Sequence, residues 1–166
     1  MQGHFDVVIK VYRPLPGKFV DGGKMSQYFG DLKVGDTVDV AGPFGLIEYL
    51  GNGEFSISKK KVSARHVGMM AGGTGVTPML QLVKAIMLKP SDPTKVSLIF
   101  ANQTEEDILV RDMLEDLQKK NPDRFKLHYT LDRPPANWKY STGFITEDMI
   151  KANLPPPGPG TLILMW

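Results

Sequence analysis

The chain has 166 residues, enough for one ordinary domain or one and a half small ones. Its formal net charge of +2 is too small to indicate nucleic acid or an acidic membrane surface as a partner. The absence of cysteine excludes disulfides and thiolate chemistry, and it is compatible with a reducing compartment. No apolar run approaches the roughly 20 residues that span a bilayer, so we expect no membrane segment in this chain. The first six residues lack the basic start and apolar core of a signal peptide.

The first half of the chain has the composition of β structure. Residues 5–12 are rich in β-branched and aromatic side chains and predict a strand, and residues 37–41 alternate apolar and polar side chains and predict another. A hairpin is predicted around Gly51-Asn52-Gly53, and residues 24–29 predict a helical start. The basic residues 59–65 are interpreted as a solvated linker between two halves, with a docking patch as the alternative.

The second half alternates strand-like and helix-like segments. Buried strands are predicted at residues 66–71 and 96–101, and two further strands at residues 125–130 and 161–165. Helices are predicted at residues 78–89, after the capping-box pattern at Thr104, and from Thr146 to Asn153. This alternation predicts a doubly wound parallel α/β sheet with right-handed crossovers. Ligands of such sheets gather at the carboxyl ends of the strands.

A glycine-rich turn lies at the first of these carboxyl ends. Gly72, Gly73 and Gly75 separate a buried strand from a helix start, at which Thr77 is predicted to cap the helix and Pro78 to occupy its first position. The free N–H groups of the first helical turn, together with the helix dipole, favour a phosphate. We interpret the turn as a cradle for a pyrophosphate. The alternative is a tight strand-to-helix turn that binds nothing.

Six segments, in this order, resemble the NADH–cytochrome b5 reductase family of the ferredoxin-reductase-like flavoproteins. They are residues 8–12 (VIKVY), 22–28 (GGKMSQY), 42–45 (GPFG), 72–79 (GGTGVTPM), 100–109 (FANQTEEDIL) and 154–158 (LPPPG). The resemblance implies a two-part α+β fold. A partial antiparallel β-barrel that binds FAD covers residues 1–62, and a doubly wound parallel α/β domain that binds NADH covers residues 63–166.

The activity implied by this resemblance is electron transfer from NADH through FAD to cytochrome b5 or a similar haem protein. Flavin is suited to this because it accepts two electrons together and releases them singly. Hydride transfer requires no general acid or base, so we assign no catalytic side chain. The three histidines are scattered without metal-ligand spacing, and we expect no metal site. The alternative function is a non-catalytic module that binds a nucleotide or a partner protein.

The resemblance also assigns residues to the FAD site. Gly22, Gly23, Lys24, Met25 and Ser26 match the segment that holds the FAD pyrophosphate through backbone donors, the Ser26 hydroxyl and the Lys24 charge. An ordinary turn with an exposed lysine is the alternative. Val8 and Lys10 match the strand that lies against the flavin, and Lys10 also has the alternative of an exposed strand lysine.

On the NADH side, the resemblance places Gly72, Gly73, Thr74 and Gly75 at the phosphates and Thr77, with Pro78 beside it, near the flavin ring. The capping role alone could also explain Thr77. Asp132 matches an acidic residue near the adenosine ribose, where a carboxylate accepts hydrogen bonds from the 2′-hydroxyl and disfavours a 2′-phosphate. Phe144 matches an aromatic residue near the adenine, with core packing as its alternative.

The chain departs from the family pattern at both ends. The family carries an Arg-Pro-Tyr-Thr-Pro-like segment before the strand that begins here at Phe5, and a Cys-Gly-Pro-Pro-Pro-Met loop after the last strand. Trp166 stands where the family has that cysteine. We therefore expect a chain truncated at both ends, whose second domain lacks its last loop. The expected location is cytoplasmic, with membrane association through an upstream segment left open.

Overall fold

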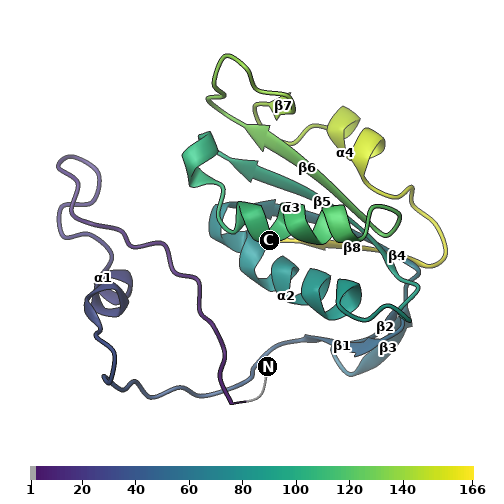
Figure 1. Ribbon diagram of the computed structural model, residues 1–166, viewed down its shortest axis with the longest axis horizontal. Helices are drawn as coiled ribbons and strands as arrows, with labels where there is room; N and C mark the ends of the chain where they lie inside the picture. Colours follow the sequence, from purple (N-terminus) through teal and green to yellow (C-terminus); the bar gives the residue numbers. More distant parts are fainter. Residues whose placement is uncertain (1–2) are drawn as a thin grey trace. The chain divides into compact units, whose positions relative to one another are not determined.

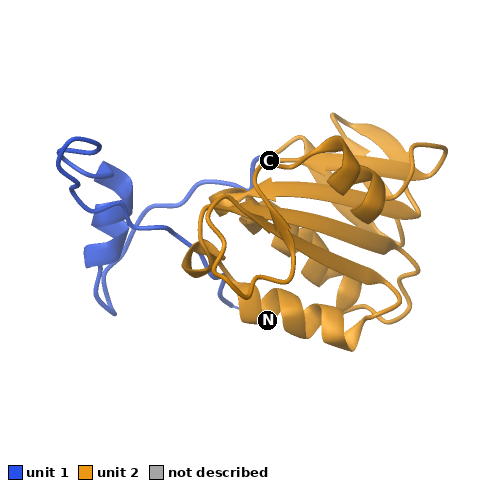
Figure 2. Ribbon diagram, turned by 90° about the horizontal axis from the view of Figure 1, so that it is seen from above, with its two compact units in different colours: residues 1–44 blue, residues 45–166 orange. Residues whose placement is uncertain are grey.

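The computed structural model describes residues 3–166. Residues 1 and 2, part of the sequence that we judged not to be a signal peptide, lie outside the described residues. The contacts divide the chain into two compact units, residues 1–44 and 45–166 (Figure 2). The sequence predicts a later domain boundary, between residues 62 and 63. That boundary remains a prediction, while the contacts assign the hairpin region before it to the second unit.

The first unit contains little regular structure. Helix α1 spans Lys24–Asp31, as the helical start at residues 24–29 predicted. The strands predicted at residues 5–12 and 37–41 are not formed, and the one strand-like pairing among the described residues of this unit is an isolated bridge between Leu15 and Phe19. The physical reason is that a strand is stabilised by hydrogen bonds to a neighbouring strand. The side-chain composition of these segments favours β structure but does not supply that neighbour.

Three antiparallel strands open the second unit. They are β1 (Ile47–Gly51), β2 (Glu54–Ile57) and β3 (Lys60–Ser63). The predicted hairpin is confirmed, and the turn uses the positive φ angles of Asn52 and Gly53. The linker predicted at residues 59–65 is wrong, because Lys60 and Lys61 pair with β2. Both lysines are exposed while Val62 packs against the core, which is the alternation of a half-buried strand.

The antiparallel sheet is anchored to the same hydrophobic core as the rest of the second unit. Phe55 is fully buried in this core. The Tyr49 hydroxyl donates to Oδ2 of buried Asp92 at 2.5 Å and accepts the Gly53 N–H at 3.0 Å. The Asn52 N–H donates to the same Asp92 oxygen at 3.0 Å. This packing and these hydrogen bonds explain why the boundary between the two compact units lies before β1 rather than after β3.

A five-stranded parallel sheet forms the centre of the second unit (Figure 1). Its order is β7-β6-β5-β4-β8, with β4 at His66–Gly72, β5 at Lys95–Asn102, β6 at Phe125–Leu131, β7 at Ser141–Thr142 and β8 at Thr161–Met165. The four predicted strands of this sheet are confirmed. The two-residue strand β7 was not predicted. Every pairing is parallel, as the alternation of strands and helices indicated.

Helices cover both faces of the parallel sheet. Helices α2 (Val76–Met87) and α3 (Arg111–Lys120) lie over one face, and α4 (Glu147–Asn153) lies over the other (Figures 1 and 2). The Thr146 hydroxyl accepts the Met149 N–H, which confirms its predicted capping role. The capping box at Thr104 is also formed, but it closes a single 3-10 turn, Glu105–Asp107, and α3 begins later. Within residues 3–166, no helix is long and apolar enough to cross a membrane.

The order of the strands creates a reversal at β4. From β4 the chain proceeds to β5, β6 and β7 on one side, and it returns on the other side of β4 as β8. In open α/β sheets, ligands bind outside the carboxyl ends of the strands where the order reverses. Here that position lies between the carboxyl ends of β4 and β8.

Candidate functional site

The glycine turn lies at the carboxyl end of β4, beside this reversal. A 3-10 turn, Gly73–Gly75, leads directly into α2. Gly73 has a φ of +51°, a conformation that favours glycine. A Cβ atom at Gly75 would lie 2.7 Å from both Cδ1 and the carbonyl oxygen of Trp166. The sequence therefore requires glycine here for a sharp turn and for a close approach to the end of β8.

Helix α2 begins earlier than predicted, at Val76, and its N-cap is Gly75. The predictions that Thr77 caps the helix and that Pro78 is its first residue are therefore wrong, because the 3-10 turn runs into the helix without an extended cap residue. Thr77 is the second helical residue, and its hydroxyl donates to the Thr74 carbonyl at 3.1 Å. Pro78 is tolerated as the third residue because the first-turn N–H groups have no acceptor within the helix.

Asp132 follows β6 at the same edge of the sheet. Its backbone N–H donates to the Asn102 carbonyl at the end of β5, over 3.1 Å, and its side chain is exposed. Phe144 lies beyond β7, in which Thr142 pairs with Leu131, the residue before Asp132. The Phe144 side chain is 82% exposed, which excludes the core-packing alternative. The structure thus brings Asp132, Phe144 and the glycine turn to one edge, formed by the carboxyl ends of four neighbouring strands.

A dinucleotide fits the chemistry of this edge. The first turn of α2 contains no acidic residue, so nothing there repels a pyrophosphate. The side-chain amide of Asn102 is buried at this edge, and neither its nitrogen nor its oxygen has a hydrogen-bond partner among the described residues. Buried polar atoms normally have partners, so an orphaned amide indicates a position that receives a polar group from outside the chain.

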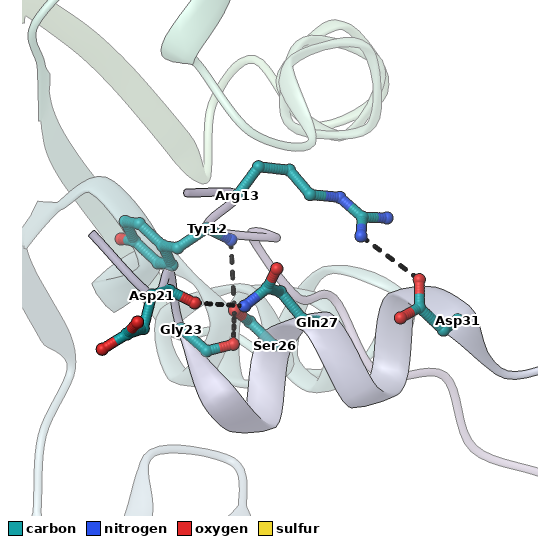
Figure 3. Close-up of polar contacts among 7 residues, drawn as sticks. All are labelled: Tyr12, Arg13, Asp21, Gly23, Ser26, Gln27 and Asp31. Atoms are coloured by element: carbon teal, nitrogen blue, oxygen red, sulfur yellow. Dashed lines mark hydrogen bonds and ion pairs between the residues drawn. The ribbon is translucent and has the colours of Figure 1, made fainter. Parts of the chain in front are cut away.

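The second candidate site is the Gly22–Ser26 turn in the first unit (Figure 3). Gly22 has a φ of +68°, and a Cβ atom there would lie 2.6 Å from the Tyr12 carbonyl oxygen. Gly23 is the N-cap of α1 and donates its N–H to the same carbonyl at 2.8 Å. A Cβ atom at Gly23 would lie 2.5 Å from the Ser26 hydroxyl. Both glycines are required by this close packing of the turn against residue 12.

The Ser26 hydroxyl links the backbone of Tyr12 to the Gly22–Ser26 turn. It accepts the Tyr12 N–H at 3.1 Å and donates its proton to the Gly23 carbonyl at 3.0 Å (Figure 3). Because its proton is engaged, the hydroxyl shapes the turn and can bind a phosphate oxygen only by releasing Gly23. The backbone N–H groups of Lys24, Met25 and Ser26 are different: they open the helix, no side chain caps them, and they have no acceptor within α1.

These N–H groups fit the pyrophosphate of FAD. They converge at one helix end that contains no acidic residue, and Lys24 is exposed beside them. Val8 and Lys10 lie in the irregular segment before the turn rather than in a strand. The Lys10 ammonium lies 5.9 Å from the centre of the Tyr12 ring. Their assignment to the flavin remains a prediction.

Sequence reasoning missed three residues that shape these sites. Tyr12 holds the Gly22–Ser26 turn through both its N–H and its carbonyl. The Gln27 side chain donates to the Asp21 carbonyl at 2.9 Å and closes the other side of that turn (Figure 3). Asn102 contributes the orphaned amide. All three lie inside segments that resemble the family, and this resemblance was the only sign of their importance in the sequence. Their roles depend on contacts in the folded structure that the sequence does not reveal. In the part of the chain that the structure describes, no group of acidic and histidine side chains could hold a metal ion.

Comparison with known proteins matches the two parts of the chain that contain these candidate sites to known domain types. Residues 69–165 match the oxidoreductase NAD-binding domain, and residues 1–49 match the oxidoreductase FAD-binding domain. The chain is 56% identical over 171 residues to NADH-cytochrome b5 reductase 2 of Gallus gallus, covering 99% of this chain and 56% of that protein. It is 54% identical to NADH-cytochrome b5 reductase 1 of Homo sapiens, with 99% and 56% covered.

A solved structure of a cytochrome b5 reductase domain is also similar to this chain. The crystal structure of the cytochrome b5 reductase domain of Ulva prolifera nitrate reductase matches 99% of this chain and 63% of that chain, with 49% identity and a TM-score of 0.95. The present chain spans about half the length of the curated relatives it matches. The chain therefore belongs to the oxidoreductase NAD-binding domain family, also matches the oxidoreductase FAD-binding domain, and is similar to NADH–cytochrome b5 reductases over 99% of its length.

Proposed function

We propose that this chain binds NADH and FAD and passes electrons from NADH, through FAD, to cytochrome b5 or a similar haem protein. The observation that carries the proposal is the glycine turn on β4. It lies where the strand order reverses, it opens directly into α2, and Asp132 lies on the same edge of the sheet. A phosphate site and a ribose site at one edge of the sheet, on the ends of two strands separated by β5, suit the length of a dinucleotide.

Each group at this edge has a distinct role toward NADH. The glycine turn, Gly72 to Gly75, and the first turn of α2 bind the pyrophosphate, because their backbone comes close and the helix dipole is favourable. Asp132 accepts hydrogen bonds from the adenosine ribose and disfavours a 2′-phosphate, so NADH binds better than NADPH. Phe144 offers an exposed ring for contact with the adenine. Thr77 stabilises the turn through Thr74.

In the first unit, the N–H groups at the start of α1 and the charge of Lys24 hold the FAD pyrophosphate. FAD, when bound, accepts two electrons together and releases them one at a time, which suits a haem acceptor. Tyr12, Ser26 and Gln27 keep the turn in the conformation that presents these donors. Exposed Lys59, Lys60 and Lys61 are a candidate contact for an acidic haem protein. A cytoplasmic location is part of the same proposal.

The test is an absorbance spectrum of the purified chain between about 350 and 500 nm, recorded before and after addition of FAD and desalting, because the flavin bands report the cofactor on which the redox chemistry depends. Flavin bands that remain with the protein support the proposal, and NADH-dependent reduction of cytochrome b5 is then measured. The absence of these bands, even after excess FAD, contradicts the reductase function.

A second candidate function is that of a nucleotide-binding module without redox activity. It is favoured by the contrast between the two units: the NADH edge is assembled on a regular sheet, whereas Val8 and Lys10 lie outside any strand. Calorimetric binding of NADH by a chain that retains no flavin would select this function. Flavin retention together with cytochrome b5 reduction would reject it.

A further inference from the structure

A cavity of about 250 Å³ lies at the amino edge of the parallel sheet, to which the proposed function gives no role. Its lining includes His66 at the start of β4, Lys95 at the start of β5, Lys126 near the start of β6, and residues 153–156 at and beyond the end of α4. The glycine turn lies at the opposite end of β4. Since β4 has seven residues and a strand rises about 3.3 Å per residue, the two edges are about 20 Å apart.

The register of the sheet gathers polar side chains on the face that α4 covers. His66 pairs with Lys95, and Ser97 pairs with Lys126. Alternate residues of a strand point to the same face, so these four side chains lie on one side of the sheet. The Lys126 ammonium identifies this as the α4 side, because it donates to the Ala152 carbonyl of α4 at 2.7 Å. The sheet and the end of α4 therefore form the walls of the cavity.

Positive charge predominates in this cavity. Lys95, Arg124 and Lys126 line it, and Asp123 is the only carboxylate among the described residues of its lining. In the part of the chain that the structure describes, none of the three cations forms an ion pair with a carboxylate. The Lys95 ammonium has no hydrogen-bond partner there either, and Lys126 uses one of its three N–H donors on α4. The cavity therefore contains cationic donors whose charge no acidic side chain neutralises.

Hydrogen bonds of Arg124 make one wall of the cavity rigid. Its guanidinium donates to three backbone carbonyls at 3.3, 3.1 and 2.7 Å, those of Ile86, Met87 and Asp92. It also donates to the side-chain oxygen of Asn121 at 2.6 Å. These acceptors are neutral groups, so they hold the guanidinium in place without removing its charge. A charged wall that is ordered before the ligand arrives lowers the entropy cost of binding.

We propose that this cavity is a binding site for a small dianionic phosphate compound, held by the ammonium groups of Lys95 and Lys126 and by the Ser97 hydroxyl. Each lysine binds phosphate as a point charge with three donors. Two such charges on neighbouring strands match the two negative charges of a phosphate monoester. A volume of about 250 Å³ is smaller than the pockets that bind drug-sized molecules, which suits a phosphate with a short substituent.

This site is independent of the proposed function. Neither the glycine turn nor the Gly22–Ser26 turn lines the cavity, and the dinucleotide of the proposed function lies at the other edge of the sheet. NADH and the phosphate compound are therefore expected to bind without competing.

Calorimetric titration of the unmodified chain with inorganic phosphate, at constant pH and ionic strength, tests the proposal. Lys95→Gln removes an exposed charge and no side-chain hydrogen bond of the described structure. The loss of a charge-assisted hydrogen bond gives an expected decrease of about fivefold in phosphate affinity. Lys61→Gln is the matched control, because exposed Lys61 of β3 lies outside the cavity. Its phosphate affinity should stay within about twofold of that of the unmodified chain, since salt screens a distant charge.

Nuclear magnetic resonance locates the bound phosphate. The chain contains three histidines, His4, His66 and His128, and His66→Gln identifies the His66 signals by their loss. Phosphate should shift the ring C–H signals of His66 along a saturating curve, and Lys95→Gln should move that curve to higher phosphate concentration. Glycerol 3-phosphate is then compared with inorganic phosphate. Tighter binding of glycerol 3-phosphate identifies a phosphate monoester as the ligand, and equal binding identifies free phosphate.

The outcomes distinguish this site from the nucleotide sites. A saturating shift of the His66 signals, together with weaker binding by Lys95→Gln alone, supports the proposal. Phosphate binding that Lys95→Gln and Lys61→Gln weaken equally, or that leaves the His66 signals unmoved, occurs elsewhere on the chain and overturns it. The absence of phosphate binding also overturns it, and NADH binding by the same sample then shows that the proposed function stands.

Discussion

The backbone N–H of Asp132 donates to the carbonyl of Asn102 over 3.1 Å, and this bond fixes the first residue after β6 to the last residue of β5. The next residue repeats the pattern, since the Arg133 N–H donates to the Gln103 carbonyl at 2.8 Å. Two successive bonds beyond the strand ends hold the Asp132 backbone in register. Asp132 is therefore held at the carboxyl edge of the sheet by hydrogen-bonded backbone.

Asp132→Ala should narrow the preference for NADH over NADPH. A hydrogen bond to a charged group contributes about 1.5–3 kcal/mol, so we expect NADH affinity to fall by about 10- to 100-fold. NADPH affinity should change less or rise, because the repulsion of the 2′-phosphate is removed. Calorimetric dissociation constants for both nucleotides measure this. Asp123→Ala is the matched control, since exposed Asp123 precedes the same strand at its amino end. An unchanged ratio of affinities in Asp132→Ala would contradict the role.

Ser26→Ala should weaken FAD binding even though the phosphate-binding N–H groups remain. The substitution removes the bonds to Tyr12 and Gly23 that shape the turn. A typical hydrogen bond contributes about 1 kcal/mol, so a loss of about five- to tenfold in FAD affinity is expected. Flavin absorbance retained after desalting measures it. Ser63→Ala, at an exposed position, is the control substitution. If Ser26→Ala retains as much flavin as the unmodified chain does, the turn does not need the Ser26 hydrogen bonds to bind FAD.

Gly75→Ala should destabilise the second unit. The added Cβ would meet backbone and side-chain atoms of Trp166, whose backbone is bonded to Met70 and Gly72 and cannot move freely. Overpacking of this kind costs about 1–3 kcal/mol, so the melting temperature should fall by several degrees in a thermal scan. Gly158→Ala is the control, because a Cβ there meets nothing within 4 Å and its φ is not positive. Equal melting temperatures for the two variants would contradict the packing at Gly75.

Asp92 should make the second unit sensitive to acid. Burial acts to raise the pKa of Asp92, but hydrogen bonds from Thr94, Tyr49 and Asn52 outweigh it and lower the pKa below the ordinary value. A carboxylate with a lowered folded pKa stabilises the fold above its unfolded pKa of about 3.9, and this contribution is lost as the pH falls through the folded value. Urea unfolding between pH 7 and pH 2 should show a corresponding loss of stability.

Asp92→Asn should reduce that loss and lower stability at pH 7, by about 2–3 kcal/mol, because the Tyr49 hydroxyl and the backbone donors lose a charged acceptor. Asp116→Asn serves as the control, since Asp116 forms an exposed pair with Lys120. The same pH dependence in Asp92→Asn and in the unmodified chain would show that another group controls acid unfolding.

The elements of the second unit were largely predictable because their signals are local. The buried strand at 66–71 is a short apolar run, the strand at 125–130 alternates apolar with polar or charged side chains, and the Thr146 cap depends on residues within four positions. The start of α2 was missed, because the 3-10 turn at Gly73 joins the helix without an extended cap residue. The strands expected at 5–12 and 37–41 failed for the opposite reason, since a strand needs a partner that its own sequence does not specify.

The sequence by itself determined the fold class, the glycine turn and the family, because apolar periodicity and matched motifs are properties of consecutive residues. Only the tertiary structure decided which of these residues meet. It placed Asp132, Phe144 and Trp166 on the same edge of the sheet as the turn through the strand order β7-β6-β5-β4-β8, and it left the Asn102 amide at that edge without a partner among the described residues. The physical reason is that strand order is set by packing between segments far apart in the chain. A local sequence pattern does not specify which distant segments will pack against it.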